Sequence, residues 1–188
     1  MPAFPSVTLL VEELTISPLT RDDATELHAA VADPELRRWL PLPSPYTLAM
    51  AENWCTEFAE TMRTEGRGFV LGIRRDGSLV GSIDAKRVDW RARTLELSYW
   101  TTAAHRGKGV MTTALRRVST WVVGELGFER VELRISPENV GSLGVARSAG
   151  FIREGTARNA GFTDAGRTDL VIWSRIPADA AGRTSLER

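Results

Sequence analysis

The sequence has little cysteine and histidine and carries no net charge. Its single cysteine excludes an internal disulfide, and the spacing of Cys55 from Trp54, Phe58 and Met62 predicts a place on the apolar face of a helix. The 24 Lys and Arg residues balance 24 Asp and Glu residues, so no overall basic field indicates a nucleic-acid partner. No Cys/His/Asp cluster has metal-ligand spacing, and we therefore predict no metal site.

The sequence also lacks a long hydrophobic run. No segment approaches the ~18 apolar residues of a membrane span, and residues 1–14 contain prolines and acids rather than a basic signal-peptide start. These features predict a cytoplasmic protein with no membrane partner. A length of 188 residues with 43% hydrophobic content fits one soluble domain. We place this domain at 1–176 and expect a flexible tail at 177–188.

Hydrophobic periodicity divides the chain into helices and strands without an internal repeat. Helical spacing of apolar residues covers about 24–31, 47–64, 110–124 and 141–149. Alternating or short apolar runs indicate strands at about 9–19, 69–73, 79–83, 94–101, 131–135, 151–158 and 167–176. Three prolines predict a loop over 39–45. This order predicts the fold class α+β, with a mixed, mostly antiparallel, twisted sheet of about seven strands flanked by about four helices.

The most informative segment runs from a predicted strand through two glycines into a predicted helix. The strand ends at 96–101, and Arg106-Gly107-Lys108-Gly109 precedes the helix. A helix N-terminus offers unpaired amide donors and a positive dipole end, and glycine lets an anion approach the backbone. We therefore expect a phosphate site, although a tight turn with solvated cations is an alternative. The spacing fits neither G-x-G-x-x-G nor a Walker loop, which disfavours a Rossmann or P-loop protein.

A second motif at 139–151 completes the pattern. Together the motifs resemble the GNAT superfamily of acyl-CoA-dependent N-acyltransferases. Arg106 and Gly109 match its motif R/Q-x-x-G-x-G/A, whereas Met111 departs from the last position. The details resemble the RimJ/RimL-type branch, the ribosomal-protein and related N-acetyltransferases, at Tyr99-Trp100, Gly107-Lys108-Gly109-Val110-Met111-Thr112, Asn139-x-x-Ser142 and Gly150-Phe151. The resemblance covers the chain from about residue 14 to residue 176.

The resemblance implies a coenzyme A thioester bound where two sheet strands splay apart. Its pyrophosphate would lie on the backbone amides of 106–112, and the backbone of 98–101 would pair with the pantetheine and the acetyl carbonyl. Asn139 matches the position that binds the pantetheine arm, although asparagine could also simply cap the following helix. The implied cofactor-binding residues are Ser98, Tyr99, Trp100, Thr101, Arg106, Gly107, Lys108, Gly109, Val110, Met111, Thr112, Asn139 and Ser142, with acetyl-CoA as the donor.

The resemblance also suggests Glu96 and Ser142 as catalytic residues. Glu96 lies on the strand before the cofactor loop and is the candidate base, acting through a water; a surface residue paired with an arginine is the alternative. The tyrosine that many members use as an acid is matched by Ala146. Ser142, which matches a serine of the RimL-like branch, is the candidate partner of the CoA sulfur. Another acidic candidate of that branch falls at Gly161, so catalysis by proximity alone stays an alternative.

These observations predict an acetyl-CoA-dependent N-acetyltransferase. The acceptor is a primary amine, either a protein N-terminal α-amine or a small molecule, that attacks the thioester directly. Acceptor contacts are expected from 39–46, 47–64 and 159–166, where Glu52 and Glu57 would favour a cationic amine. An acyl-CoA-binding sensor or degenerate member without turnover is the main alternative. A dimeric scaffold is the third, and a homodimer is open for the enzyme as well.

Overall fold

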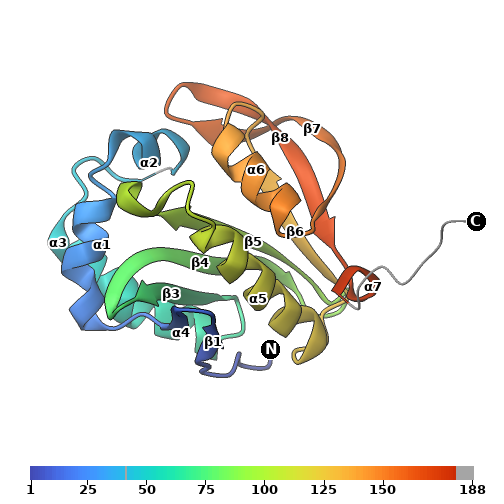
Figure 1. Ribbon diagram of the computed structural model, residues 1–188, viewed down its shortest axis with the longest axis horizontal. Helices are drawn as coiled ribbons and strands as arrows, with labels where there is room; N and C mark the ends of the chain where they lie inside the picture. Colours follow the sequence, from blue (N-terminus) through green and yellow to red (C-terminus); the bar gives the residue numbers. More distant parts are fainter. Residues whose placement is uncertain (41, 181–188) are drawn as a thin grey trace, which may run out of the picture.

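One sheet with helices on both faces organises the chain (Figure 1). The computed structural model describes residues 1–40 and 42–180. The strands are β1 (Leu9–Val11), β2 (Leu14–Pro18), β3 (Phe69–Arg75), β4 (Ser78–Asp89), β5 (Thr94–Thr101), β6 (Arg130–Ile135), β7 (Ile152–Thr163) and β8 (Gly166–Arg175). The α-helices are α1 (Ala24–Ala30), α2 (Pro34–Trp39), α3 (Leu48–Asn53), α4 (Ala59–Thr64), α5 (Val110–Gly124), α6 (Val140–Ser148) and α7 (Pro177–Ala180).

The predicted α+β fold with a mixed, mostly antiparallel sheet is confirmed. The strand order is β1-β2-β3-β4-β5-β6-β8-β7, and β5 with β6 is the parallel pair. Parallel neighbours need a crossover connection, and α5 supplies it between these two strands. All other neighbouring strands of the described chain pair antiparallel.

The sheet has eight strands because the opening segment turns back on itself. Its alternating residues suggest one strand over 9–19, but Glu12 adopts a φ of 51° and the chain reverses there. Leu9 then pairs with Ile16, and Val11 pairs with Leu14. Alternation alone cannot detect such a tight reversal, because both arms keep the same apolar period.

The helices differ from the prediction in three places. The segment 47–64 is helical as expected but contains a π-helical stretch, Trp54–Phe58, between α3 and α4. An additional helix, α2, precedes the predicted loop over 39–45 and includes its first residue, Trp39, whereas Pro41 of that loop lies outside the described residues. Pro177–Ala180 form α7 where a flexible tail is predicted, and residues 181–188 lie outside the described part.

The α2 helix begins at a signal that is easily misread. Asp33-Pro34 ends α1, but it also starts α2, because proline is favoured at the first helical position and aspartate at the N-cap. The Asp33 side chain accepts a hydrogen bond from the Glu35 backbone N–H at 3.0 Å. The same dipeptide therefore separates two short helices.

Two hydrophobic clusters hold the helices against the sheet. The larger one joins α5 to the sheet face that carries Ile16, Leu71 and Leu97. The smaller one joins α1, α3 and α4 to the opposite face, where Val70 and Leu79 lie. Two buried layers of this kind fix β5 in the centre of the molecule, next to the loop that starts α5.

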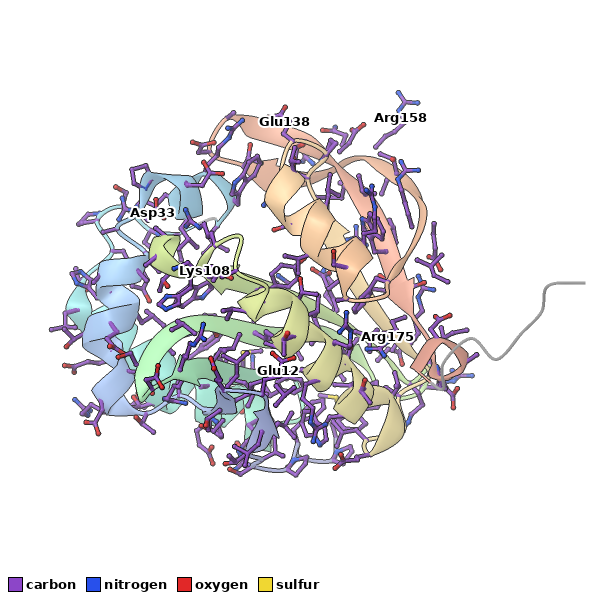
Figure 2. All side chains as sticks on the ribbon, viewed as in Figure 1. Glu12, Asp33, Lys108, Glu138, Arg158 and Arg175 are labelled. Carbon is purple, nitrogen blue, oxygen red and sulfur yellow. The ribbon has the colours of Figure 1, made fainter. Side chains whose placement is uncertain are left out.

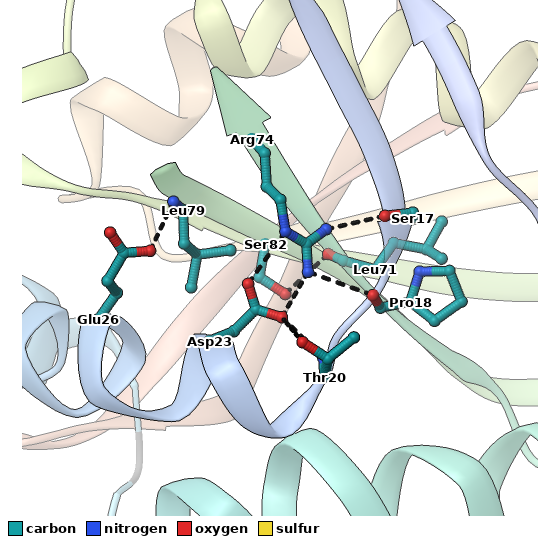
Figure 3. A network of polar contacts seen from close by, with 9 residues as sticks. All are labelled: Ser17, Pro18, Thr20, Asp23, Glu26, Leu71, Arg74, Leu79 and Ser82. Atoms are coloured by element: carbon teal, nitrogen blue, oxygen red, sulfur yellow. Dashed lines mark hydrogen bonds and ion pairs between the residues drawn. The ribbon is translucent and has the colours of Figure 1, made fainter. Parts of the chain in front are cut away.

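A buried ion pair connects α1 to β3 (Figure 3). Arg74 Nε donates to Asp23 Oδ1 at 3.0 Å, and its guanidinium also forms an ion pair with Asp23 Oδ2. Asp23 Oδ2 in turn accepts from the Thr20 backbone N–H at 2.7 Å, as part of a capping box. Arg74 donates further to the Ser17 hydroxyl at 2.8 Å, so one carboxylate ties a helix start to two strands.

Cys55 is predicted to be chemically inert in the folded protein. It belongs to the smaller cluster and is 2% exposed, which confirms its place on an apolar helix face. Burial is the main cause that raises the pKa of its thiol to about 11, so the reactive thiolate is scarce at pH 8. We expect no labelling by a disulfide reagent such as dithionitrobenzoate at pH 8 until denaturant is added. Rapid labelling of the folded protein would contradict this packing.

In residues 1–40 and 42–180, no helix is both long enough and apolar enough to cross a membrane.

Candidate active site

The central feature of the site is a splay between β5 and β6. The two strands pair over only three positions, Thr94–Glu96 with Arg130–Glu132. Beyond Glu96, β5 stays paired with β4 through Thr101. The other edge of Leu97–Thr101 has no ladder to β6 among the described residues, so its backbone donors and acceptors are available to a ligand.

A cavity of about 640 Å³ opens beside this splay, between α5, α6 and α2. Most of the residues predicted to bind a cofactor line it: Tyr99, Trp100, Thr101, Arg106, Gly107, Gly109, Val110, Met111, Thr112, Asn139 and Ser142. Ser98, Lys108 and Glu96 are not among its lining residues. Lys108 is exposed on the loop that precedes α5 (Figure 2).

The first residues of α5 form part of the wall of the same cavity, and their backbone amides are free to bind a ligand there. Gly107 and Gly109 have φ angles of 71° and 79°, which a residue with a side chain rarely adopts. The Thr113 N–H bonds to the Gly109 carbonyl at 3.0 Å, so the amides that precede Thr113 lack partners within the helix. Free amides at the positive end of a 15-residue helix form an anion site, as the sequence suggests.

Arg106 is held in place by the neighbouring helix. Its guanidinium forms an ion pair with Asp33, and its Nε donates to the Thr101 carbonyl at 3.2 Å. Asp33 is the N-cap of α2. The ion pair therefore couples the loop before α5 to α2, and it partly neutralises the charge of Arg106 next to the expected phosphate site.

The α2 helix, which the sequence analysis did not predict, forms a wall of the cavity. Arg38 and Glu138 form an ion pair at 2.9 Å, and the Asp164 N–H bonds to the Arg38 carbonyl at 3.3 Å. These contacts connect α2 to the segment before α6 and to the β7–β8 turn. Lining residues that the motifs missed are Glu35, Leu36, Arg38, Trp39, Leu40, His105 and Glu138.

Asn139 and Tyr99 fix the position of α6. The Asn139 side chain accepts from the Ser142 N–H at 3.0 Å, so it caps α6 and lines the cavity as well. The Tyr99 hydroxyl donates to the Ser142 carbonyl at 2.9 Å across the cavity wall. Burial raises the pKa of Tyr99, whose hydroxyl therefore stays protonated as this donor. Both contacts set the place of the Ser142 side chain relative to β5.

Glu96 lies on the sheet face opposite α5 and is already paired. Its side chain is 8% exposed, and Lys86, Arg87 and Arg134 approach its carboxylate at 3.6, 3.2 and 3.8 Å. Burial raises the pKa of Glu96, and the three cations partly offset that rise. The pKa of the Glu96 carboxyl is thus raised, as suits a general base, but its carboxylate also forms ion pairs with three cations.

Comparison with known proteins identifies the family. Residues 13–152 match the model of the acetyltransferase (GNAT) domain. The chain belongs to the GNAT family of acetyltransferases. This confirms the resemblance seen in the loop before α5 and at Asn139 to Phe151. YdaF of Bacillus subtilis, whose name places it among the ribosomal N-acetyltransferases, is 30% identical over 91% of this chain and 95% of its own.

Solved structures share the GNAT fold over nearly the whole chain. RimL, a ribosomal L7/L12 α-N-protein acetyltransferase in complex with coenzyme A, has a TM-score of 0.84 at 18% identity and covers 93% of this chain and 99% of its own. The self-immunity acetyltransferase MccE, in complex with acetyl-CoA and AMP, has a TM-score of 0.80 at 20% identity and covers 88% of this chain and 93% of its own. At these sequence identities, the similarity to the two solved structures shows the fold of this chain and nothing about its ligand or substrate.

Across residues 1–40 and 42–180 of this GNAT chain, no group of three or more His, Cys, Asp or Glu side chains is arranged to hold a metal ion.

Proposed function

We propose that this GNAT acetyltransferase transfers the acetyl group of acetyl-CoA to a primary amine. The observation that carries the proposal is the joint placement of the free β5 edge and the N-terminus of α5 on one cavity. A pyrophosphate suits the free amides at Val110, Met111 and Thr112, and a pantetheine amide suits the unpaired backbone at Leu97–Thr101. The complexes of RimL and MccE support coenzyme A and acetyl-CoA as the ligand class.

The transfer itself needs a neutral amine next to the thioester carbonyl. The amine nitrogen forms a bond to the carbonyl carbon, the carbon–sulfur bond breaks, and the thiolate takes up a proton. Orientation of the two reactants supplies much of the rate, equivalent to ~7–11 kcal/mol in well-aligned systems. Glu96 accepts the amine proton through a water, and the Ser142 hydroxyl donates to the departing sulfur; each role is worth ~10²–10⁴-fold.

A protein N-terminal α-amine is the acceptor that we favour over a small molecule. The name of YdaF, a relative that matches 91% of this chain, supports this acceptor class and a place in the cytoplasm, where ribosomal proteins are found. α2 bounds the cavity and contacts the β7–β8 turn, so we expect these two elements to meet the chain of a peptide acceptor.

Thiol release from acetyl-CoA, measured with a panel of peptides and small amines, tests the proposed function. We expect amine-dependent release by the wild-type protein. Glu96→Gln and Ser142→Ala should each lower kcat at least tenfold with little change in acetyl-CoA affinity. Acetyl-CoA binding without release in the presence of any amine would favour the alternative of a sensor without turnover. Release that neither substitution changes would leave proximity as the mechanism.

A further inference from the structure

A second carboxylate lies on the same sheet face as Glu96, one strand away. Asp84 of β4 pairs in register with Ser98 of β5, which lies two residues beyond the last β5–β6 pair. The Ser98 hydroxyl donates to Asp84 Oδ2 at 2.7 Å. Asp84 therefore lies on β4 directly across from Ser98, a residue of the free edge of β5, and both are on the sheet face opposite α5.

Asp84 differs from Glu96 in its ionic partners. Three cations surround the Glu96 carboxylate, whereas no basic side chain of the described residues lies within 4.0 Å of Asp84. Lys86 is the nearest cation on the same strand, and its ammonium is directed to Glu96. Asp84 is nevertheless only partly exposed. It is thus a half-buried carboxylate with one neutral hydrogen-bond donor and unused acceptor capacity.

Aromatic side chains lie on the same sheet face as Asp84, and Trp100 is the one that the strand register places near it. Trp100 pairs with Ser82, so it lies diagonally across from Asp84 on the same face, within reach of a large side chain. Trp100 also lines the 640 Å³ cavity, so this residue borders both that cavity and the Asp84 face, although Asp84 itself is not among the lining residues. Trp100, Tyr46 and Trp54 pack as partly buried residues on the cluster of this face. A carboxylate beside partly exposed aromatic rings is a typical environment for an alkylammonium ion.

We propose that Asp84 binds the protonated amine of the acceptor and positions it beside the thioester. This inference rests on the proposed function, because it names the group that recognises the amine. The ammonium donates to the free carboxylate oxygen of Asp84 while Ser98 holds the other oxygen. Asp84 is an acceptor-binding residue in this scheme. The bound ammonium passes one proton through a water to Glu96, the neutral amine then attacks the thioester, and the second N–H proton goes to the departing thiolate.

The cost of the Asp84 charge supports a role in binding. Burial raises the pKa of Asp84, and Lys86 and the Ser98 hydroxyl offset only part of that rise. A carboxyl whose pKa is raised on folding stabilises the fold fully below its unfolded pKa, and this contribution is lost as the pH rises through the folded value. At neutral pH the charged Asp84 therefore lowers stability. An asparagine would keep the bond from Ser98 without that penalty.

The test compares Asp84→Asn with the charge-matched control Glu65→Gln, an exposed site at the C-terminal end of α4. Binding of butylamine and of an alanyl peptide amide to the CoA-saturated protein is followed by NMR, with butanol as the uncharged probe. We expect the affinity of Asp84→Asn for both amines to fall at least tenfold, with Glu65→Gln unchanged and the response to butanol the same in all variants.

The same variants are then compared in kinetics and stability. Asp84→Asn should raise the KM for the amine at least tenfold, leave the acetyl-CoA affinity unchanged, and unfold in urea at the same or a higher midpoint at pH 7. Equal amine affinity in Asp84→Asn and wild type, or no amine binding by the wild type, would overturn the inference. Because binding is measured without turnover, an inactive wild type that still binds amines through Asp84 would overturn the proposed function alone.

Discussion

Replacement of Gly109 by valine is expected to weaken acetyl-CoA binding at least a hundredfold while the protein stays folded. Gly109 has a φ of 79°, a conformation that a β-branched residue strongly disfavours. A Cβ at this position would meet no atom of the protein within 4 Å, so space within the protein is not the constraint. The branched side chain would instead occupy the approach to the amides of α5 and shift the turn that presents them.

A second glycine provides the control for backbone strain. Gly77, in the β3–β4 turn, has a φ of 83° and equally open surroundings. Gly77→Val should therefore destabilise the fold to a similar degree and leave the acetyl-CoA affinity unchanged. Isothermal titration calorimetry of both variants separates strain from ligand exclusion. An affinity of Gly109→Val within a few-fold of wild type would remove the phosphate-site assignment.

The largest expected loss of stability follows from replacing Asp23 by alanine. The side chains of Asp23 and Arg74 are 7% and 15% exposed, so the substitution leaves a nearly buried guanidinium without its carboxylate. It also removes the capping box with Thr20 (Figure 3). Breaking one partner of a buried ion pair costs about 3–5 kcal/mol. We expect urea unfolding of Asp23→Ala to report a loss of this size.

Two further variants show whether the buried pair is the cause. Replacing both partners, in Asp23→Ala/Arg74→Met, should recover part of the loss, because no uncompensated charge stays buried. Glu13→Ala breaks the ion pair with Arg75, in which the Glu13 side chain is 67% exposed. An exposed pair of this kind contributes about 0–1 kcal/mol. Equal losses in Asp23→Ala and Glu13→Ala would contradict the buried network.

The part of the site that the sequence predicts is the part built from local geometry. The glycines before α5, the N-cap of α6 at Asn139 and the long amphipathic α5 each depend on residues close in sequence, and all are present. A sequence motif can therefore predict the cavity wall formed by residues 106–112. The acceptor side of the cavity is predicted less well, because no motif spans the residues that form it.

The contacts that sequence could not predict join residues far apart in the chain. Arg106 and Asp33 are 73 positions apart, and Arg38 and Glu138 are 100 apart. Neither pair belongs to a pattern. The Asp84–Ser98 contact depends on the register of β4 with β5, which only the folded sheet sets. Position in the sheet, and not residue type, distinguishes Asp84 from other surface acids.

Some of the predictions made from the sequence concern the place of the protein in the cell, its assembly and its domain boundary. The location in the cytoplasm, a homodimer and the boundary at 176 stay predictions. The catalytic roles of Glu96 and Ser142 do so as well, and they are tested by the kinetics of their variants.

Transfer itself is tested most directly by the mass of the amine after incubation with the protein and acetyl-CoA. The reaction is run with an alanyl peptide amide and with butylamine, and Gly109→Val serves as the cofactor-binding control. We predict that the amine product gains one acetyl group in the wild-type reaction and none in the control. Binding of acetyl-CoA with no acetylated amine of either kind would contradict the account and leave a cofactor-binding protein without turnover.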